Sequence, residues 1–209
     1  MGCSDFVTSK LKQVVEKIET MLETLSKLKN PHCEFVLLKA SFSLLKVSYL
    51  ARTCPPSSSY LGLWENLDDL IRDSLNEILG LSLSDKSWLQ AQILVVKGGL
   101  VLLSAFLQSS AAFLSSWSGC QSLMEQLAPE LDLSVISTLR ALEHLSHALK
   151  REEVLPEEVV MSLTQKELSL LINTIDLEHL VESVGNTWEK AHLLSAQMPH
   201  CHMQGTGCM

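Results

Sequence analysis

Apolar residues recur along this chain at the three- and four-residue spacing of an α-helix, and rarely at the two-residue spacing of a strand. The aromatic fraction is only 5%, and glycine and proline are scarce. The sequence therefore predicts an all-α fold, an irregular multi-helix bundle of about seven to nine helices. The clearest helix spans residues 7–29, where one apolar stripe comprises Leu11, Val14, Ile18, Met21, Leu25 and Leu28.

Breaks between such stripes set the other expected helices. Asn30-Pro31 precedes residues 32–51, which are apolar on nearly every side and are predicted to form one buried helix. The Pro- and Ser-rich residues 54–59 predict a loop. Tyr49 of the helix 32–51 is expected to face the core.

Further helices are expected at 60–79, which Gly80 ends, and around Trp88, which Ser84 or Asp85 caps. Others are expected at 134–150, where Leu139 is expected to face the core, at 156–161, and after the capping box Thr164–Glu167. The last two are expected at 177–184, capped by Asp176, and at 188–198, capped by Thr187.

One segment has two interpretations. Residues 98–124 carry no charge, and a membrane helix needs about 20 predominantly apolar residues. Glycine, serine and glutamine interrupt the run, and its flanks lack a clear bias of lysine and arginine. We therefore expect a buried core helix over 93–116, with a membrane helix as the alternative.

Length and cysteine usage bound the organisation of the chain. Its 209 residues suit a single helical domain over residues 1–199, with 129–133 as the point at which it would subdivide, followed by a disordered tail at 200–209. The six cysteines form no C-x-x-C pair, and the N-terminus lacks the apolar stretch of a signal peptide. We expect an intracellular protein, cytoplasmic or nuclear, that does not enter a membrane.

The net charge of −8 is unevenly distributed. Residues 1–52 carry eight Lys/Arg and five Asp/Glu, a net of +3, whereas residues 53–209 carry eight and nineteen, a net of −11. An acidic body repels phosphate backbones, so nucleic-acid binding by the chain alone is disfavoured.

Motifs that carry chemistry are missing or weak. The sequence has no phosphate-binding glycine loop and no G-x-S-x-G nucleophile motif. Asp68-Asp69 is predicted to be a solvent-facing helix edge, and His144 with His147 a solvated or packed pair. The sequence predicts no enzyme, no cofactor, and no catalytic or metal-binding residue. The tail contains four residues of types that bind zinc, but their adjacent positions are a poor ligand geometry: His200, Cys201, His202 and Cys208.

Several weak motifs, taken in order, suggest a family. They resemble the helical region that follows the reverse transcriptase domain in the polyproteins of non-LTR-type retrotransposons. The similarity covers about residues 6–200 and departs from the family in lacking a proline before the glycine pair and a basic residue after it. The motifs are Pro31-His32, Tyr49–Pro55, Asp68-Asp69, Leu75–Leu79, Trp88–Gln92, Val96–Leu100, Ser110–Ser116, Lys190–Ser195 and Pro199-His200.

The resemblance implies a thumb-like or connecting segment without catalytic activity of its own, because no Tyr/Phe-x-Asp-Asp polymerase motif is present. In an intact element such helices would support the polymerase and could touch the template–primer backbone. The residues expected to keep such a contact are Lys39, Lys46 and Arg52.

A second hypothesis is an intracellular helical module for protein–protein interaction. The stripe from Leu11 to Leu28 motivates it, because heptad-like apolar spacing also suits pairing with a partner helix. The same stripe could instead pack on a neighbouring helix of this chain.

Overall fold

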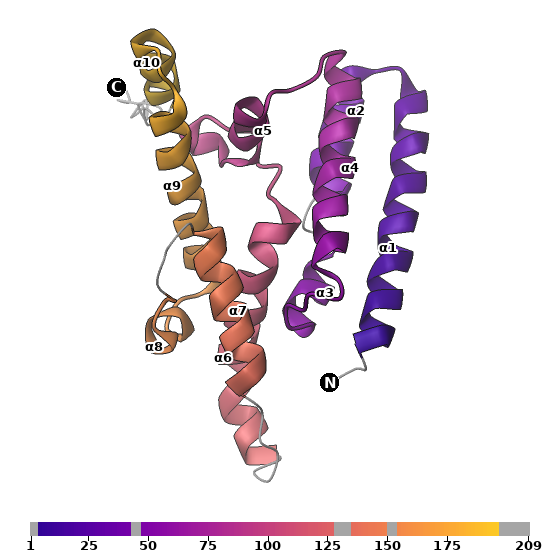
Figure 1. Ribbon diagram of the computed structural model, residues 1–209. Helices are drawn as coiled ribbons and strands as arrows, with labels where there is room; N and C mark the ends of the chain where they lie inside the picture. Colours follow the sequence, from indigo (N-terminus) through magenta and orange to yellow (C-terminus); the bar gives the residue numbers. More distant parts are fainter. Residues whose placement is uncertain (1–3, 43–46, 128–134, 150–153, 197–209) are drawn as a thin grey trace, which may run out of the picture.

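The computed structural model describes residues 4–42, 47–127, 135–149 and 154–196, and these residues form helices, turns and loops but no strand. This confirms the predicted all-α fold, with more short helices than expected (Figure 1). In chain order the α-helices are α1 (Ser4–Leu25), α2 (Pro31–Leu37), α3 (Ser48–Thr53), α4 (Leu61–Leu79), α5 (Asp85–Gln92), α6 (Ala105–Leu127), α7 (Val135–Ala148), α8 (Glu157–Met161), α9 (Gln165–Ser183) and α10 (Thr187–Ser195).

Local capping chemistry explains several helix boundaries. The Asn30 side chain accepts a hydrogen bond from the Cys33 amide at 3.1 Å, and Pro31 occupies the first turn of α2. Ser84 caps α5 as predicted, and Thr164 with Glu167 forms the predicted capping box of α9. Gly80 ends α4 with a φ of +66°, in the left-handed region that favours glycine.

The apolar stripe of α1 lies inside the protein. Leu11, Ile18 and Leu25 are buried against α4 and its neighbours, and Val14 and Met21 pack partly buried on the same cluster. Only Leu28, which lies beyond α1 in a 3-10 turn, is exposed. The stripe thus packs on neighbouring helices of the same chain, which is the second of the two roles that its spacing allowed.

A second hydrophobic cluster joins α6, α7 and α9. Leu114 of α6, Leu142 and Leu145 of α7, and Leu168 of α9 are all fully buried in it. Because α6 also contributes Ala105 and Ala112 to the first cluster, this helix connects the two cores. Figure 1 shows the consequence: α1 and α4 lie side by side, and α6 and α7 form a second pair.

The single buried helix predicted for residues 32–51 is wrong. The chain forms α2, then a π-helical segment at Leu38–Phe42, and later the short α3. Tyr49, expected in the core, is 75% exposed, and Leu45 lies outside the described residues. A segment that is apolar on every side has no periodicity to mark its inner face, so the sequence could not reveal where the helix is interrupted.

The region 93–116 is helical only from Ala105 onward. Before it come a 3-10 turn at Val95–Lys97, a turn through Gly98 and Gly99, and residues 100–104 without regular secondary structure. The absence of charge is explained by burial, because residues 108–114 of α6 are buried in the protein. Among the described helices, none combines the length and apolar character needed to cross a membrane.

Three smaller predictions also need correction. Asp176 does not start a new helix, because α9 runs without a break through this buried residue. The cap of α10 is Asn186, one residue before Thr187, and its side chain accepts from the Trp188 amide. Leu139 is 44% exposed. The predicted tail 200–209 and the subdivision at 129–133 lie outside the described residues.

Candidate functional site: the connection between α4 and α6

One polar stripe on α4 organises the structure around it. Asp68, Arg72 and Asn76 are spaced four residues apart, so they lie on one face of the helix. Each of them bonds to the chain between α4 and α6, residues 80–104. The sequence analysis missed this stripe, because Asp69, Asp73 and Glu77 repeat the same four-residue spacing on the exposed side of the helix.

Asp68 completes the N-terminus of α6. Its two carboxylate oxygens accept from the backbone amides of Ala105 at 2.7 Å and Phe106 at 3.2 Å, and from the Ser104 hydroxyl. Ser104 itself accepts from the amides of Leu107, through its hydroxyl, and Gln108, through its carbonyl. Three of the amides that a helix start leaves unpaired, those of Ala105, Phe106 and Leu107, are thus satisfied, and the carboxylate lies at the positive end of the helix dipole.

Burial controls the titration of this carboxyl group. Desolvation raises the pKa of Asp68 from 3.8 to about 6, although the three hydrogen bonds and the helix start act in the opposite direction. The prediction that Asp68-Asp69 forms a solvent-facing edge is therefore wrong for Asp68 and right for Asp69, which is exposed.

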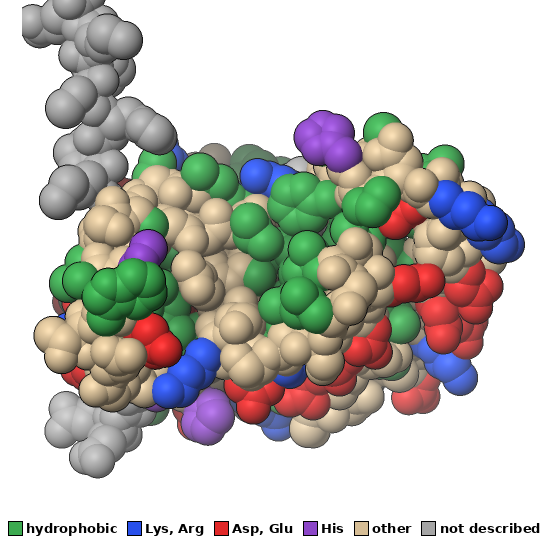
Figure 2. All heavy atoms as spheres, turned by 90° about the horizontal axis from the view of Figure 1, so that it is seen from above, with side chains coloured by type: hydrophobic (Ala, Val, Ile, Leu, Met, Phe, Trp, Pro, Cys, Tyr) green, Lys and Arg blue, Asp and Glu red, His purple; other side chains and the backbone are tan. Residues whose placement is uncertain are grey.

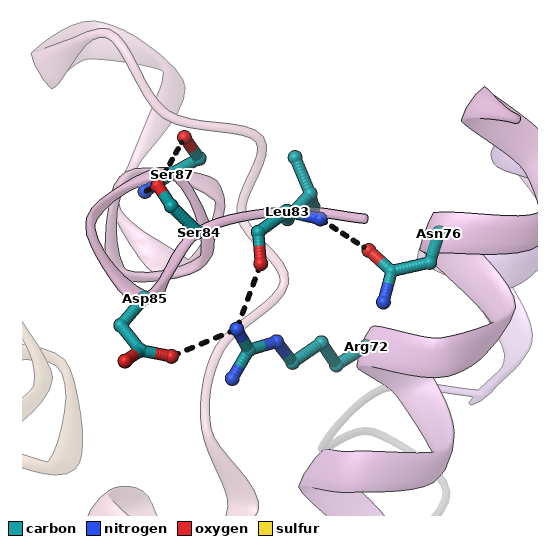
Figure 3. Close-up of polar contacts among 6 residues, drawn as sticks. All are labelled: Arg72, Asn76, Leu83, Ser84, Asp85 and Ser87. Atoms are coloured by element: carbon teal, nitrogen blue, oxygen red, sulfur yellow. Dashed lines mark hydrogen bonds and ion pairs between the residues drawn. The ribbon is translucent and has the colours of Figure 1, made fainter. Parts of the chain in front are cut away.

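Arg72 and Asn76 hold the first part of the connection (Figure 3). The Arg72 guanidinium donates to the Leu83 carbonyl and to the Asp85 carboxylate, both at 2.8 Å. The Asn76 side-chain oxygen accepts from the Leu83 amide at 2.9 Å. Both backbone groups of Leu83 are therefore bound by α4, one residue before Ser84 caps α5, and this fixes where α5 begins.

The second part of the connection folds back onto the end of α5. The Ala91 carbonyl accepts from the amides of Leu100 and Leu102, and the Ile93 carbonyl accepts from the Val101 amide. The Gln90 side chain donates to the Gly98 carbonyl. The turn is tight, because a Cβ atom on Gly99 would lie 2.0 Å from the Ile93 carbonyl oxygen.

Backbone strain accompanies this turn. Val101 has a φ of +63°, a conformation that a β-branched residue rarely adopts. Such a residue costs about 1–2 kcal/mol and persists only where its surroundings determine it. Two contacts from α9 supply such surroundings: Asn173 accepts from the Leu94 amide at 3.1 Å, and Lys97 donates to the Thr174 hydroxyl at 2.6 Å.

Two of the candidate nucleic-acid residues, Arg52 and Lys39, already hold interactions within the chain. The Arg52 guanidinium donates twice to the Gln165 side-chain oxygen, at 3.0 and 2.6 Å, and so ties α3 to the start of α9. Lys39 is half-buried and already holds an interaction within the chain. Lys46 lies outside the described residues. The structure thus gives Arg52 an internal role that the sequence did not indicate.

In the part of the chain that is described, we find no arrangement of side chains suited to metal binding or to nucleophilic catalysis. No group of three or more His, Cys, Asp or Glu side chains there could hold a metal ion. The four tail residues from His200 to Cys208 lie outside that part. The Asp68 carboxylate is fully engaged by donors that build the fold. The arrangement can position helices, and it does not present a reactive group.

A shallow groove lies between α5 and the C-terminal helices. Its volume is about 700 Å³, and it is lined by Gln90, Leu180, Trp188, His192 and Leu193 among others. The Trp188 side chain is 69% exposed, and its ring meets that of His192 edge to face at 4.3 Å. Figure 2 views the end of the molecule at which α10 lies, where apolar side chains gather with acidic and basic ones around them.

Comparison with family models, curated proteins and solved structures finds no match to this chain.

Proposed function

We propose that this chain is a catalytically inert helical segment of the kind that follows the reverse transcriptase domain in non-LTR-type retrotransposon polyproteins. It supports a protein neighbour and carries out no chemistry of its own. One observation supports the proposal: motif residues behind the resemblance have structural roles around a single connection. Asp68 caps α6, Gln90 and Ala91 bond to the returning chain, and Gly99 permits the turn.

The proposal includes a negative expectation about nucleic acid. The net charge of −11 over residues 53–209 and the internal bonding of Arg52 both disfavour a phosphate contact. We expect no retention of an RNA–DNA hybrid at low salt and about 10 μM protein in a filter-binding assay. Retention that falls in Arg52→Gln and persists in the exposed control Lys190→Gln would show a direct nucleic-acid role and contradict this expectation.

A direct test uses the polymerase itself. The full chain is mixed with a recombinant reverse transcriptase domain from a non-LTR retrotransposon from which the following helical region has been deleted. We expect micromolar association in sedimentation velocity, with no change in the helical content of the chain. Absence of a complex at about 100 μM of each protein would contradict the support role, since that is the weak end of useful affinities.

The alternative is an independent module for protein–protein interaction, and the groove with its exposed Trp188 favours it. Exposed aromatic side chains beside a groove are typical anchors of protein interfaces. If this groove binds a protein, Trp188→Ala abolishes a specific interaction. The control Leu170→Ala removes an exposed side chain of α9 outside the groove and leaves the interaction intact. Equal binding by the two variants in a titration with the purified partner would exclude the groove.

A further inference from the structure

The His144 side chain of α7 packs against Ser110 and Phe106 of α6, and this position of the ring is called the seat. Its Nδ1 lies 2.6 Å from the Ser110 hydroxyl oxygen, and its ring meets the Phe106 ring edge to face with centroids 4.6 Å apart. Ser110 is fully buried, so the pair does not offer a serine nucleophile to a substrate. Its role must lie in how α7 is held on α6, not in catalysis.

The ring can carry its single proton on either nitrogen. The Ser110 hydroxyl donates to a bare Nδ1 or accepts from a protonated one, since a hydroxyl serves both roles. In both cases the doubly protonated ring carries a proton on Nε2. That Nε2 is buried and has no hydrogen-bond partner. The neutral ring thus already holds one unpaired polar atom, and a second proton would put a charge there.

The surroundings offer the Nε2 proton of the charged ring no acceptor in this seat. On the α6 side it meets Phe106 and Ser110, neither of which carries charge. On its own helix the charged or titratable neighbours are Arg140, Glu143 and His147, and His147 disfavours a second positive charge. Burial and His147 together lower the pKa of His144.

A cavity next to the seat gives the ring a second position. Its volume is about 340 Å³. Three uncharged residues of the loop before α4 and the first residue of α4 line one side of it. Arg140, Glu143 and His144 line its other side. An imidazolium that turned into this space would meet water and the Glu143 carboxylate. The lining residues from the loop and α4 are Pro56, Ser57, Ser58 and Leu61.

We propose that His144 is a proton-operated latch between α6 and α7. The neutral ring occupies the seat against Ser110 and Phe106 and holds α7 in place. The protonated ring leaves the seat for the cavity, and α7 then loosens from the second core. This inference does not depend on the proposed function. The ring takes one proton from water and forms one N–H bond, the hydrogen bond between Ser110 and Nδ1 is lost, and no other covalent bond changes.

The test is amide hydrogen exchange of the full chain at pH 6.5 and 5.5, with rates corrected for intrinsic exchange. Each pH unit below the ordinary histidine pKa favours the open state by up to about tenfold. We expect exchange in residues 138–148 to accelerate by up to that factor in the wild type, and exchange in α1 to stay constant. His144→Gln, which keeps a neutral polar side chain, should remove the acceleration, and His179→Gln, which replaces an exposed histidine of α9, should keep it.

NMR titration of the histidine rings in the wild type gives an answer even if His144→Gln fails to fold. We expect His144 to titrate below 6.5, together with shifts of α7 amides. The latch is overturned if His144 titrates at or above 6.5. It is also overturned if α7 in the wild type shows no acceleration, or if His144→Gln accelerates as much as the wild type.

Discussion

Asp68 and Asp69 are adjacent in the sequence, but their side chains have different surroundings in the fold. Asp69 faces solvent, whereas Asp68 reaches the start of α6 and binds three donors there. Nothing in the sequence separates the two, because both stand between leucines in the same helix. The difference comes from the partner residues 104–106, which the fold brings to α4 from 36 to 38 positions away.

The raised pKa of Asp68 predicts an effect of pH on stability. In the folded chain this pKa is about 6, above its ordinary 3.8, so the folded state binds the proton first as pH falls. The wild type should therefore gain stability relative to Asp68→Asn between pH 7.5 and 5.5. Urea denaturation followed by circular dichroism at three pH values measures this difference.

Asp69→Asn controls for the general loss of a carboxylate. The difference in free energy of unfolding between this variant and the wild type should stay constant over the same pH range. His144 is present in all three proteins, so its own titration cancels. A wild type that loses ground to Asp68→Asn as pH falls would show that the hydrogen bonds, and not burial, dominate the titration of this group.

At the scale of helices, prediction succeeded where a cap and a one-sided apolar face coincide. The helix 60–79 with Gly80, the short helix after Ser84 and the capping box at Thr164 are all present. Prediction failed at residues 93–104, because long-range bonds from α4, α5 and α9 hold that stretch and leave no local periodicity. The polar stripe of α4 escaped notice because its bonding partners lie 7 to 38 positions away in the sequence.

Gly99 provides the test of the α5–α6 connection. Alanine there would place its Cβ 2.0 Å from the Ile93 carbonyl oxygen and 2.6 Å from that of Gln90, both backbone atoms that cannot turn aside. We expect Gly99→Ala to lower the free energy of unfolding by about 2–4 kcal/mol. Chemical denaturation measures it.

Gly119 is the matched control, since it lies in α6 with no atom within 4 Å of an added Cβ. Gly119→Ala should raise the free energy of unfolding by about 0.5–1 kcal/mol. Similar values for the two variants would mean that the turn at Gly99 is looser than described.

At the scale of the whole molecule, two hydrophobic cores share α6, and α1 is part of the first. The sequence could show that α1 has an apolar stripe but could not show what covers it, because a heptad spacing suits an internal neighbour and an external partner equally. The candidate basic residues show the same limit: Arg52 is bonded to Gln165, 113 positions away in the sequence.

Removal of one stripe residue distinguishes these two roles. Ile18 is fully buried, so Ile18→Ala should lower the free energy of unfolding by about 3 kcal/mol without any change of mass in light scattering. Leu28→Ala removes the exposed residue of the same stripe and should change stability by less than about 0.5 kcal/mol. A mass that falls in Ile18→Ala would show that the stripe joins separate chains.

The bonds from the polar stripe of α4 hold the connection to α6. The most direct measurement is residue-resolved amide exchange in Asp68→Ala beside Asp69→Ala. We predict faster exchange at Ala105 and Phe106, whose amides bond to Asp68, in the first variant and wild-type rates in the second. Unchanged protection of these two amides in Asp68→Ala, or equal acceleration in both variants, would contradict the claim.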